Sequence, residues 1–256
     1  MILLSLPVFL ATAAAVAVFV VGTVGAFILF RRFFPAEMSE DLKNAGAWGA
    51  LRIGTIHALI LALVFVDVRQ EYNELGETIE NEALAVEQLY LELSRIDSEE
   101  AHAIQQRLTS YIRIVVDQEW ASLANDRPVK AADALVSDIR QSLFNLPPAE
   151  APQPVAASLM DNIKDIENMR GQRSFDTVEP VATIFWIIII LGFIFTSLCF
   201  FAYNATPFHC AILAMFAAIN GAVCYSIIAL THPFVGGTAV TPTAFEMVFE
   251  RTVGTR

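Results

Sequence analysis

His57 is the one clearly ionisable side chain near the middle of an apolar run, the stretch from Trp48 to Val66. An ionisable group at that depth of a membrane is costly unless it faces protein or water. Three interpretations are open: a neutral histidine hydrogen-bonded to a neighbouring helix, a pore-lining or proton-sensing group, and a metal ligand. No partner lies at ligand spacing from it, which argues against the metal.

Three acidic residues, Asp67, Glu71 and Glu74, follow directly after this apolar run, with Arg69 between them. If several copies of the chain surrounded one axis, the three would repeat as an acidic ring. Such a ring concentrates cations at a pore mouth. The alternative is the solvated polar face of an amphipathic helix.

Sequence motifs of enzyme chemistry are missing. The chain has no Gly-rich phosphate loop, no serine nucleophile elbow and no His-x-x-x-His or Cys-x-x-Cys pair. Cys199, Cys210 and Cys224 lie in or beside the last two apolar runs, so neither a disulfide framework nor a zinc site is predicted. We therefore expect no catalytic residue, no cofactor and no resident metal, and a protein that is not an enzyme.

Four apolar runs must position these side chains: Leu3–Phe30, Trp48–Val66, Val181–Tyr203 and Ala211–Leu230. Each is long enough to cross a hydrocarbon core of ~30 Å as a helix. We expect an all-α fold with four transmembrane helices in a 2 + 2 layout around a helical extramembrane domain. The expected domains are helices 1 and 2 in residues 1–66, the extramembrane domain in 67–179, helices 3 and 4 in 180–230, and a C-terminal tail with an interfacial helix in 231–256.

Charge is concentrated in the extramembrane domain, where residues 67–179 hold 22 acidic and 10 basic side chains, against a net charge of −11 for the whole chain. An acidic domain repels nucleic acid, so nucleic-acid binding is not expected. Basic residues near the span ends are evenly divided between the two sides, so the positive-inside rule does not decide the orientation.

The second span carries two neighbouring stripes at helical spacing. Small residues recur every four positions, a pattern that lets another helix approach closely. They are Ala50, Gly54, Ala58 and Ala62. An adjacent stripe is mostly apolar and contains the histidine: Ile53, His57, Leu61 and Phe65. Such a helix suits a place in an oligomer, although packing against the chain's own spans is an equal alternative.

The same helix is predicted to continue beyond the membrane, because an apolar heptad-like seam runs on without a proline. The seam consists of Val68, Tyr72, Leu75, Ile79, Ala83, Val86, Tyr90 and Leu93. It either pairs with a partner protein or closes its own bundle. Asp97 is expected to cap a second helix, Asp126 and Pro128 to start a third, and residues 155–169 to form a fourth.

Several short motifs occur in a fixed order: Asn81-Glu82-Ala83, Leu89-Tyr90, Tyr111, Asp117-Gln-Glu119-Trp120, Arg170-x-x-Arg173, Pro233-Phe234-x-Gly236, and Thr241-Pro242 followed by Phe245. Together they cover nearly the whole chain and resemble the bestrophin-like family of bacterial multi-pass membrane proteins. We expect Glu119 to pair with Arg170 or Arg173, and Glu82 to pair likewise. Asn204, His209 and Asn220, near or within the last two spans, are expected to form hydrogen bonds between helices.

Bestrophins are pentameric ion channels in which the second span lines the pore and continues into a cytosolic helical domain. The resemblance implies a homo-oligomer, a pentamer by analogy, in a bacterial inner membrane. It also implies that the acidic domain is cytoplasmic and that the pore follows the second span. The acidic calcium-binding cluster of animal bestrophins is not visible, since only Glu246 and Glu250 lie in the tail.

The leading hypothesis is therefore a bestrophin-like ion channel that leans toward cations, with the lipid bilayer and inorganic ions as partners. Ile53, His57, Leu61 and Phe65 would face the conduction path, and this apolar constriction could gate by dewetting. The alternative is a non-conducting membrane scaffold or sensor whose acidic helical domain binds a partner protein.

Overall fold

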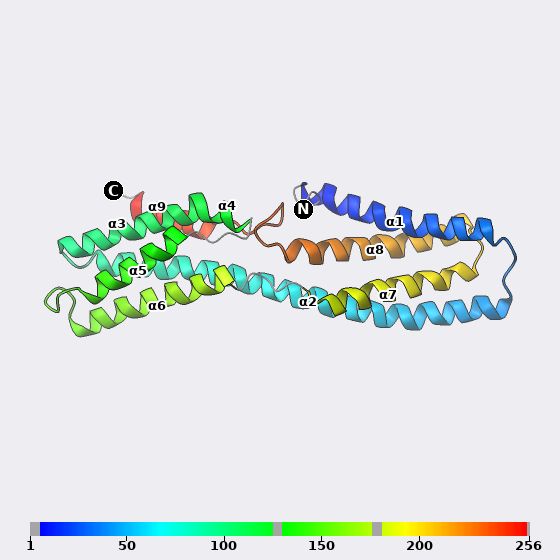
Figure 1. The fold of residues 1–256 in the computed structure, drawn as a ribbon, viewed down its shortest axis with the longest axis horizontal. Coiled ribbons are helices and arrows are strands. Elements are labelled where there is room, and N and C mark those ends of the chain that lie inside the picture. Colours follow the sequence, from blue (N-terminus) through cyan, green and yellow to red (C-terminus); the bar gives the residue numbers. More distant parts are fainter. Residues whose placement is uncertain (1–5, 125–129, 176–180, 255–256) are drawn as a thin grey trace. The chain divides into compact units, whose positions relative to one another are not determined.

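The computed structural model describes residues 6–124, 130–175 and 181–254, which form helices and no strand (Figure 1). The α-helices are α1 (Val8–Phe33), α2 (Glu40–Leu93), α3 (Glu99–Ile114), α4 (Trp120–Leu123), α5 (Lys130–Phe144), α6 (Gln153–Phe175), α7 (Thr183–Cys199), α8 (Pro207–Leu230) and α9 (Thr243–Val253). A π-helix, η1 (Val115–Glu119), joins α3 to α4, and a 3₁₀ turn, η2 (Phe200–Ala202), follows α7. The predicted all-α fold is confirmed, while the predicted helix start at Asp126 and Pro128 lies outside the described residues.

Four of these helices are long and apolar enough to cross a membrane: α1, α2, α8, and α7 together with η2. Helix α2 is unbroken for 54 residues, so the predicted continuation through Asp67 is confirmed. No proline interrupts it, and its 54 residues correspond to a length of about 80 Å.

The chain forms two compact units, and α2 contributes to both of them. Unit 1 comprises Met1–Glu71 and Val178–Thr238, and it contains the four candidate spans. Unit 2 comprises Tyr72–Thr177 and Ala239–Arg256. The C-terminal tail is thus divided between the two units at Thr238.

Close contacts at small residues hold the helices of unit 1 together. Helix α1 lies along α8, where Gly221 accommodates the Phe19 side chain (Figure 1). Helix α7 lies along α2, where a Cβ atom at Gly54 would be 3.3 Å from Thr196 Cγ2 and one at Gly49 would be 3.0 Å from Cys199 Sγ. Small residues therefore set the helix spacing, as in other membrane proteins.

Much of the surface of the four spans is not covered by the chain itself. Between 11% and 39% of the residues in each apolar window are buried. The span part of α2 exposes large apolar side chains, including Leu51, Ile56, Leu59, Leu63 and Val66. These surfaces require lipid or other protein to cover them, as expected of a membrane-embedded unit.

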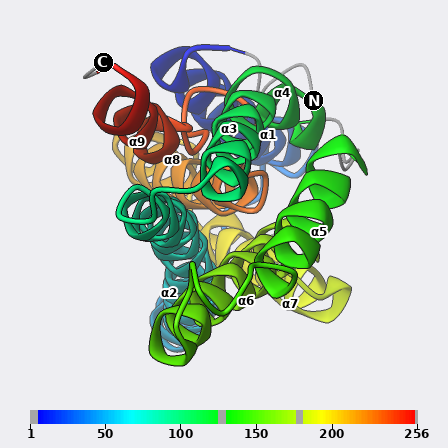
Figure 2. The same ribbon diagram turned by 90° about the vertical axis from the view of Figure 1, so that its left-hand side faces the viewer.

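Unit 2 is a helical bundle with an apolar core. Helix α3 packs against α5 and α9, and α5 packs against α6 (Figure 2). The seam of α2 is buried in this core at Leu75, Ile79, Val86 and Leu93. Of the two alternatives for the seam, the structure supports closure of the chain's own bundle.

One local prediction in unit 2 is wrong, and another, the interfacial helix, stays a prediction. Helix α3 is capped by Ser98, whose hydroxyl accepts a hydrogen bond from the Ala101 N–H, rather than by Asp97. The predicted interfacial helix corresponds to α9, but Phe245 and Val248 are buried among protein side chains. These two side chains belong to the core of unit 2.

Candidate functional site

The side chain of His57 is buried between the helices of unit 1, with 3% of its surface exposed. Its Nε2 lies 2.6 Å from Oδ1 of Asn220 in α8. The Asn220 amide donates through Nδ2 to the carbonyl oxygen of Phe216, so Oδ1 is the atom free to accept. We therefore assign Nε2–H of His57 as the donor of this hydrogen bond.

Helix α7 makes room for this imidazole at Gly192. A Cβ atom there would lie 2.5 Å from His57 Nδ1, closer than any side chain tolerates. Within the described residues Nδ1 has no hydrogen-bond partner. The histidine thus packs against α7 and forms a hydrogen bond with α8, as in the first of the three interpretations.

A hollow of ≈ 860 Å³ opens between α2, α7 and α8 next to His57. This α2 hollow is lined by three members of the predicted pore stripe, His57, Leu61 and Phe65, and by the whole small-residue stripe, Ala50, Gly54, Ala58 and Ala62. Asn220 and Thr196 add polar groups to a wall that is otherwise mostly apolar. Seven of the eight predicted residues of the span therefore lie around one space.

Burial divides the predicted pore stripe. Ile53 is half-exposed and does not line the α2 hollow, and Phe65 is half-exposed at its wall. His57 and Leu61 are buried inside the unit. In the small-residue stripe, Gly54 contacts α7, whereas Ala58 and Ala62 are exposed. Burial thus separates His57 and Leu61, inside the unit, from Ile53 and Phe65 nearer its surface.

The three predicted acidic residues follow on α2 at spacings of four and three, which places them on one side of the helix. Asp67 and Glu74 are exposed, and Glu71 is half-buried. Asp67 and Glu71 line a second hollow of ≈ 390 Å³ in unit 1, whose apolar walls include Leu63 and Phe185. A carboxylate beside apolar walls exerts a stronger field than one in open water.

A network of buried charges lies in the core of unit 2. Arg170 makes a two-pronged contact with Glu119, with nitrogen to oxygen distances of 2.8 and 2.9 Å, and also contacts Asp133. Arg173 contacts Glu82 at 2.7 and 3.1 Å and reaches Glu119 at 3.4 Å. Glu82, Glu119 and Arg173 are completely buried. The predicted pairing of both glutamates with these arginines is confirmed.

Tyr111 completes the network from α3, because its hydroxyl donates a hydrogen bond to Glu82. Burial raises the pKa of this phenol strongly, and the negative charge of Glu82 raises it further. Burial opposes the charged form of Arg170, but the hydrogen bonds that it donates to Glu119 and the negative charge of that carboxylate raise the arginine pKa. The phenol is therefore neutral and the guanidinium charged across the physiological pH range.

The irregular segment between α3 and α4 positions the carboxylate of Glu119. Glu119 is the last residue of the π-helix η1, a geometry rare outside functional or strained positions. The next residue, Trp120, places its ring 5.3 Å from the Arg173 guanidinium and donates its indole N–H to the carbonyl of Val240. Phe245 of α9 also faces Arg173, at 5.9 Å. Aromatic rings thus cover the buried cation.

Some partners in these sites could not be assigned from the sequence. Gly192, Phe216 and Thr196 surround His57 or the α2 hollow, and no motif marks them. Asn220 was expected to bond another helix, but nothing identified His57 as its partner. The one available signal is chemical, since Asn220 and His57 are polar groups at the depth of opposite spans and each needs a partner there.

Known families and solved structures match most of the chain. Residues 17–245 match the family described as Bestrophin-like domain. Two solved structures, both described as crystal structures of a membrane protein and representing two variants, are similar to this chain with a TM-score of 0.65 each. They are 12% and 13% identical to it, and each match covers 94% of this chain and 96% of the other. Curated proteins give no match.

Proposed function

Because the chain belongs to the bestrophin-like family, we propose that it forms a homo-oligomeric ion channel in a bacterial inner membrane, with α2 of each copy beside the conduction path. By analogy with bestrophins the oligomer is a pentamer, and the acidic unit 2 faces the cytoplasm. Lipid and inorganic ions are its partners.

The α2 hollow is the observation that carries this proposal. One chain leaves it open between α2, α7 and α8, and its wall combines small residues with the polar pair of His57 and Asn220. Copies arranged around an axis would cover the exposed apolar face of α2 and enclose a mostly apolar passage. Passages of this kind gate ions by dewetting.

Selectivity for cations follows from the acidic residues beyond the span. Asp67 and Glu74 are exposed on α2, so every copy would contribute two carboxylates to a ring at the end of the passage. A ring of carboxylates raises the local concentration of cations and repels anions.

The alternative is a non-conducting scaffold or sensor, which needs a surface on unit 2 that binds a partner protein. The seam of α2 is buried within unit 2, so a partner protein would have to bind the outer surface of the bundle. Oligomeric state in mild detergent separates the two functions, since a monomer cannot enclose a symmetric central pore.

Planar-bilayer recording of the purified oligomer tests the proposal. We expect discrete currents whose reversal potential, in a salt gradient, follows the equilibrium potential of the cation. Absence of current across salts and pH values, from a preparation whose oligomers are intact by mass measurement, would contradict conduction and leave the scaffold.

A further inference from the structure

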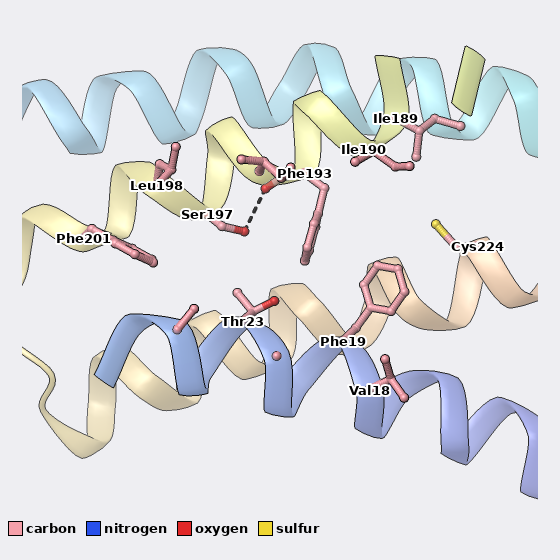
Figure 3. Close-up of a pocket in the computed structure, with 13 residues that line it drawn as sticks. Val18, Phe19, Thr23, Ile189, Ile190, Phe193, Ser197, Leu198, Phe201 and Cys224 are labelled. Atoms are coloured by element: carbon pink, nitrogen blue, oxygen red, sulfur yellow. Dashed lines mark hydrogen bonds between the residues drawn. The ribbon is translucent and has the colours of Figure 1, made fainter. Parts of the chain in front are cut away.

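An apolar groove of ≈ 540 Å³ lies between α1 and α7 in unit 1 (Figure 3). Along α1 it extends from Val18 to Ala26, about 12 Å at the rise of a helix. Its polar lining is restricted to two hydroxyls and a thiol. The Ser197 hydroxyl already donates to the Phe193 carbonyl oxygen at 2.7 Å (Figure 3), so the groove offers mainly hydrocarbon contacts.

Helix α1 leaves this α1–α7 groove open. A Cβ atom at Gly22, in the groove wall, would have no other atom within 4 Å. The rings of Phe19 and Phe193 meet at 5.2 Å across it. A space of this shape in a membrane suits a chain of methylene groups.

A buried cation lies beyond one end of the groove. Phe201 lines that end and packs against Phe27 and Phe30 of α1, at 5.4 and 5.1 Å between ring centres. The next residue of α1, Arg31, is 8% exposed, and its Nη2 donates to Oδ1 of Asn204. Its Nη1 has no hydrogen-bond partner within the described chain.

No acidic side chain forms an ion pair with this guanidinium among the described residues. Lys43, at the same end of unit 1, is already paired with Glu40 at 2.8 Å, and its backbone carbonyl accepts the Tyr203 hydroxyl. The ion pairs of the structure include none with Arg31 among the residues described. A charged group at a span end without a counterion calls for an anion.

We propose that the α1–α7 groove binds an anionic phospholipid, with one acyl chain between α1 and α7 and the phosphate at Arg31. A guanidinium matches phosphate oxygens in geometry and charge. A span of a second copy fits the charge less well, because none of the four apolar runs contains Asp or Glu. This site is separate from the proposed conduction path and does not depend on it.

Native mass spectrometry of the full-length protein in detergent tests the site, with phosphatidylglycerol and phosphatidylcholine of identical acyl chains as probes. We expect the anionic lipid to bind about tenfold more tightly than the zwitterionic one. Arg31→Gln should remove that preference, whereas Arg32→Gln, an exposed neighbour on α1, should keep it. Inorganic phosphate should not displace the lipid, since it lacks the hydrocarbon chain.

A second pair of variants tests the groove without touching the charge. Gly22→Leu should fill the groove and reduce binding of both lipids several-fold. Gly25→Leu is the matched control, because its Cβ also meets nothing within 4 Å but it does not line the groove. Helical content and thermal transitions like those of the wild type establish that these variants fold.

Two outcomes would overturn the proposal. The first is equal binding of the two lipids by the wild type. The second is unchanged lipid binding by Gly22→Leu, and dissociation of the oligomer by the same variant would then assign the groove to a second copy of the chain.

Discussion

The imidazole of His57 occupies a place where three helices leave it little freedom. Asn220 fixes its Nε2, Gly192 of α7 lies against its Nδ1, and the Phe216 ring is 6.3 Å away. None of these neighbours carries a charge, so protonation of the ring would place an uncompensated cation within the span. The residue therefore has a packing role, and its response to protons is a prediction.

Gly192→Ala should destabilise the protein by about 1–3 kcal/mol, because the new methyl group would overlap His57 Nδ1 and force the ring away from Asn220. Thermal unfolding in detergent measures the effect. His57→Ala should relieve it, so the double variant should be less destabilised than the sum of the single variants. Gly25→Ala, which meets open space, is the control.

Removal of the imidazole should change how current responds to pH. In the proposed channel, we expect wild-type current to depend on pH and His57→Ala to flatten that dependence. His209→Ala, at the start of α8 and bonded to Asn204, should retain it. An identical profile for wild type and His57→Ala would reject His57 as the sensor.

Tyr111→Phe should make stability less sensitive to alkali. Burial raises the folded-state pKa of Tyr111, so its contribution to stability is complete below the unfolded-state value of about 10 and declines as the pH rises above it. The wild type should lose stability more steeply than the variant above about pH 10. The free energy of unfolding between pH 8 and 11, measured on full-length protein, gives both slopes.

Helix α6 supplies both arginines of the buried network from one face, since Arg170 and Arg173 are three residues apart. Their carboxylate partners come from α2, η1 and α5, so the ion pairs join four elements of unit 2. Buried ion pairs of this kind add little net stability over apolar packing, but loss of one partner strongly destabilises the protein. They fix which helices meet.

Arg173→Leu should therefore cost about 3–5 kcal/mol, because it strands the carboxylate of Glu82 in the core. Arg140→Leu, which breaks the partly exposed pair with Glu167, should cost about 1 kcal/mol or less. Chemical denaturation compares the two. Replacing Glu82 and Arg173 together by leucine should recover part of the loss. A full loss in the double variant would contradict this account.

At the level of elements, much of the fold could be predicted because helices have periodic signals. The apolar seam from Val68 to Leu93 predicted that α2 continues beyond the span. The two arginines of Arg170-x-x-Arg173 predicted ion pairs with Glu82 and Glu119. The π-helix at Val115–Glu119 and the burial of Phe245 have no such signal. They arise from contacts between segments far apart in sequence, which a local pattern does not encode.

For the whole assembly, the acidic residues on α2 set the expected selectivity. Asp67→Asn together with Glu74→Gln should shift the reversal potential toward that of the anion by removing two charges per copy from the ring. Glu80→Gln is the matched control, an exposed acid on the opposite side of α2 from Glu71. Recording in a tenfold salt gradient separates the variants. Equal reversal potentials would exclude the ring as the selectivity element.

The order in which the chain is made has a consequence for how unit 2 matures. Its core needs α9, yet α7 and α8 are translated before α9 leaves the ribosome. Until then Arg173 lacks the Phe245 ring, and the aromatic cover of the buried charges is incomplete. The earlier helices of the unit must wait, partly assembled, while two hydrophobic segments are inserted into the bilayer. Maturation of this protein should therefore be sensitive to chaperone supply during synthesis.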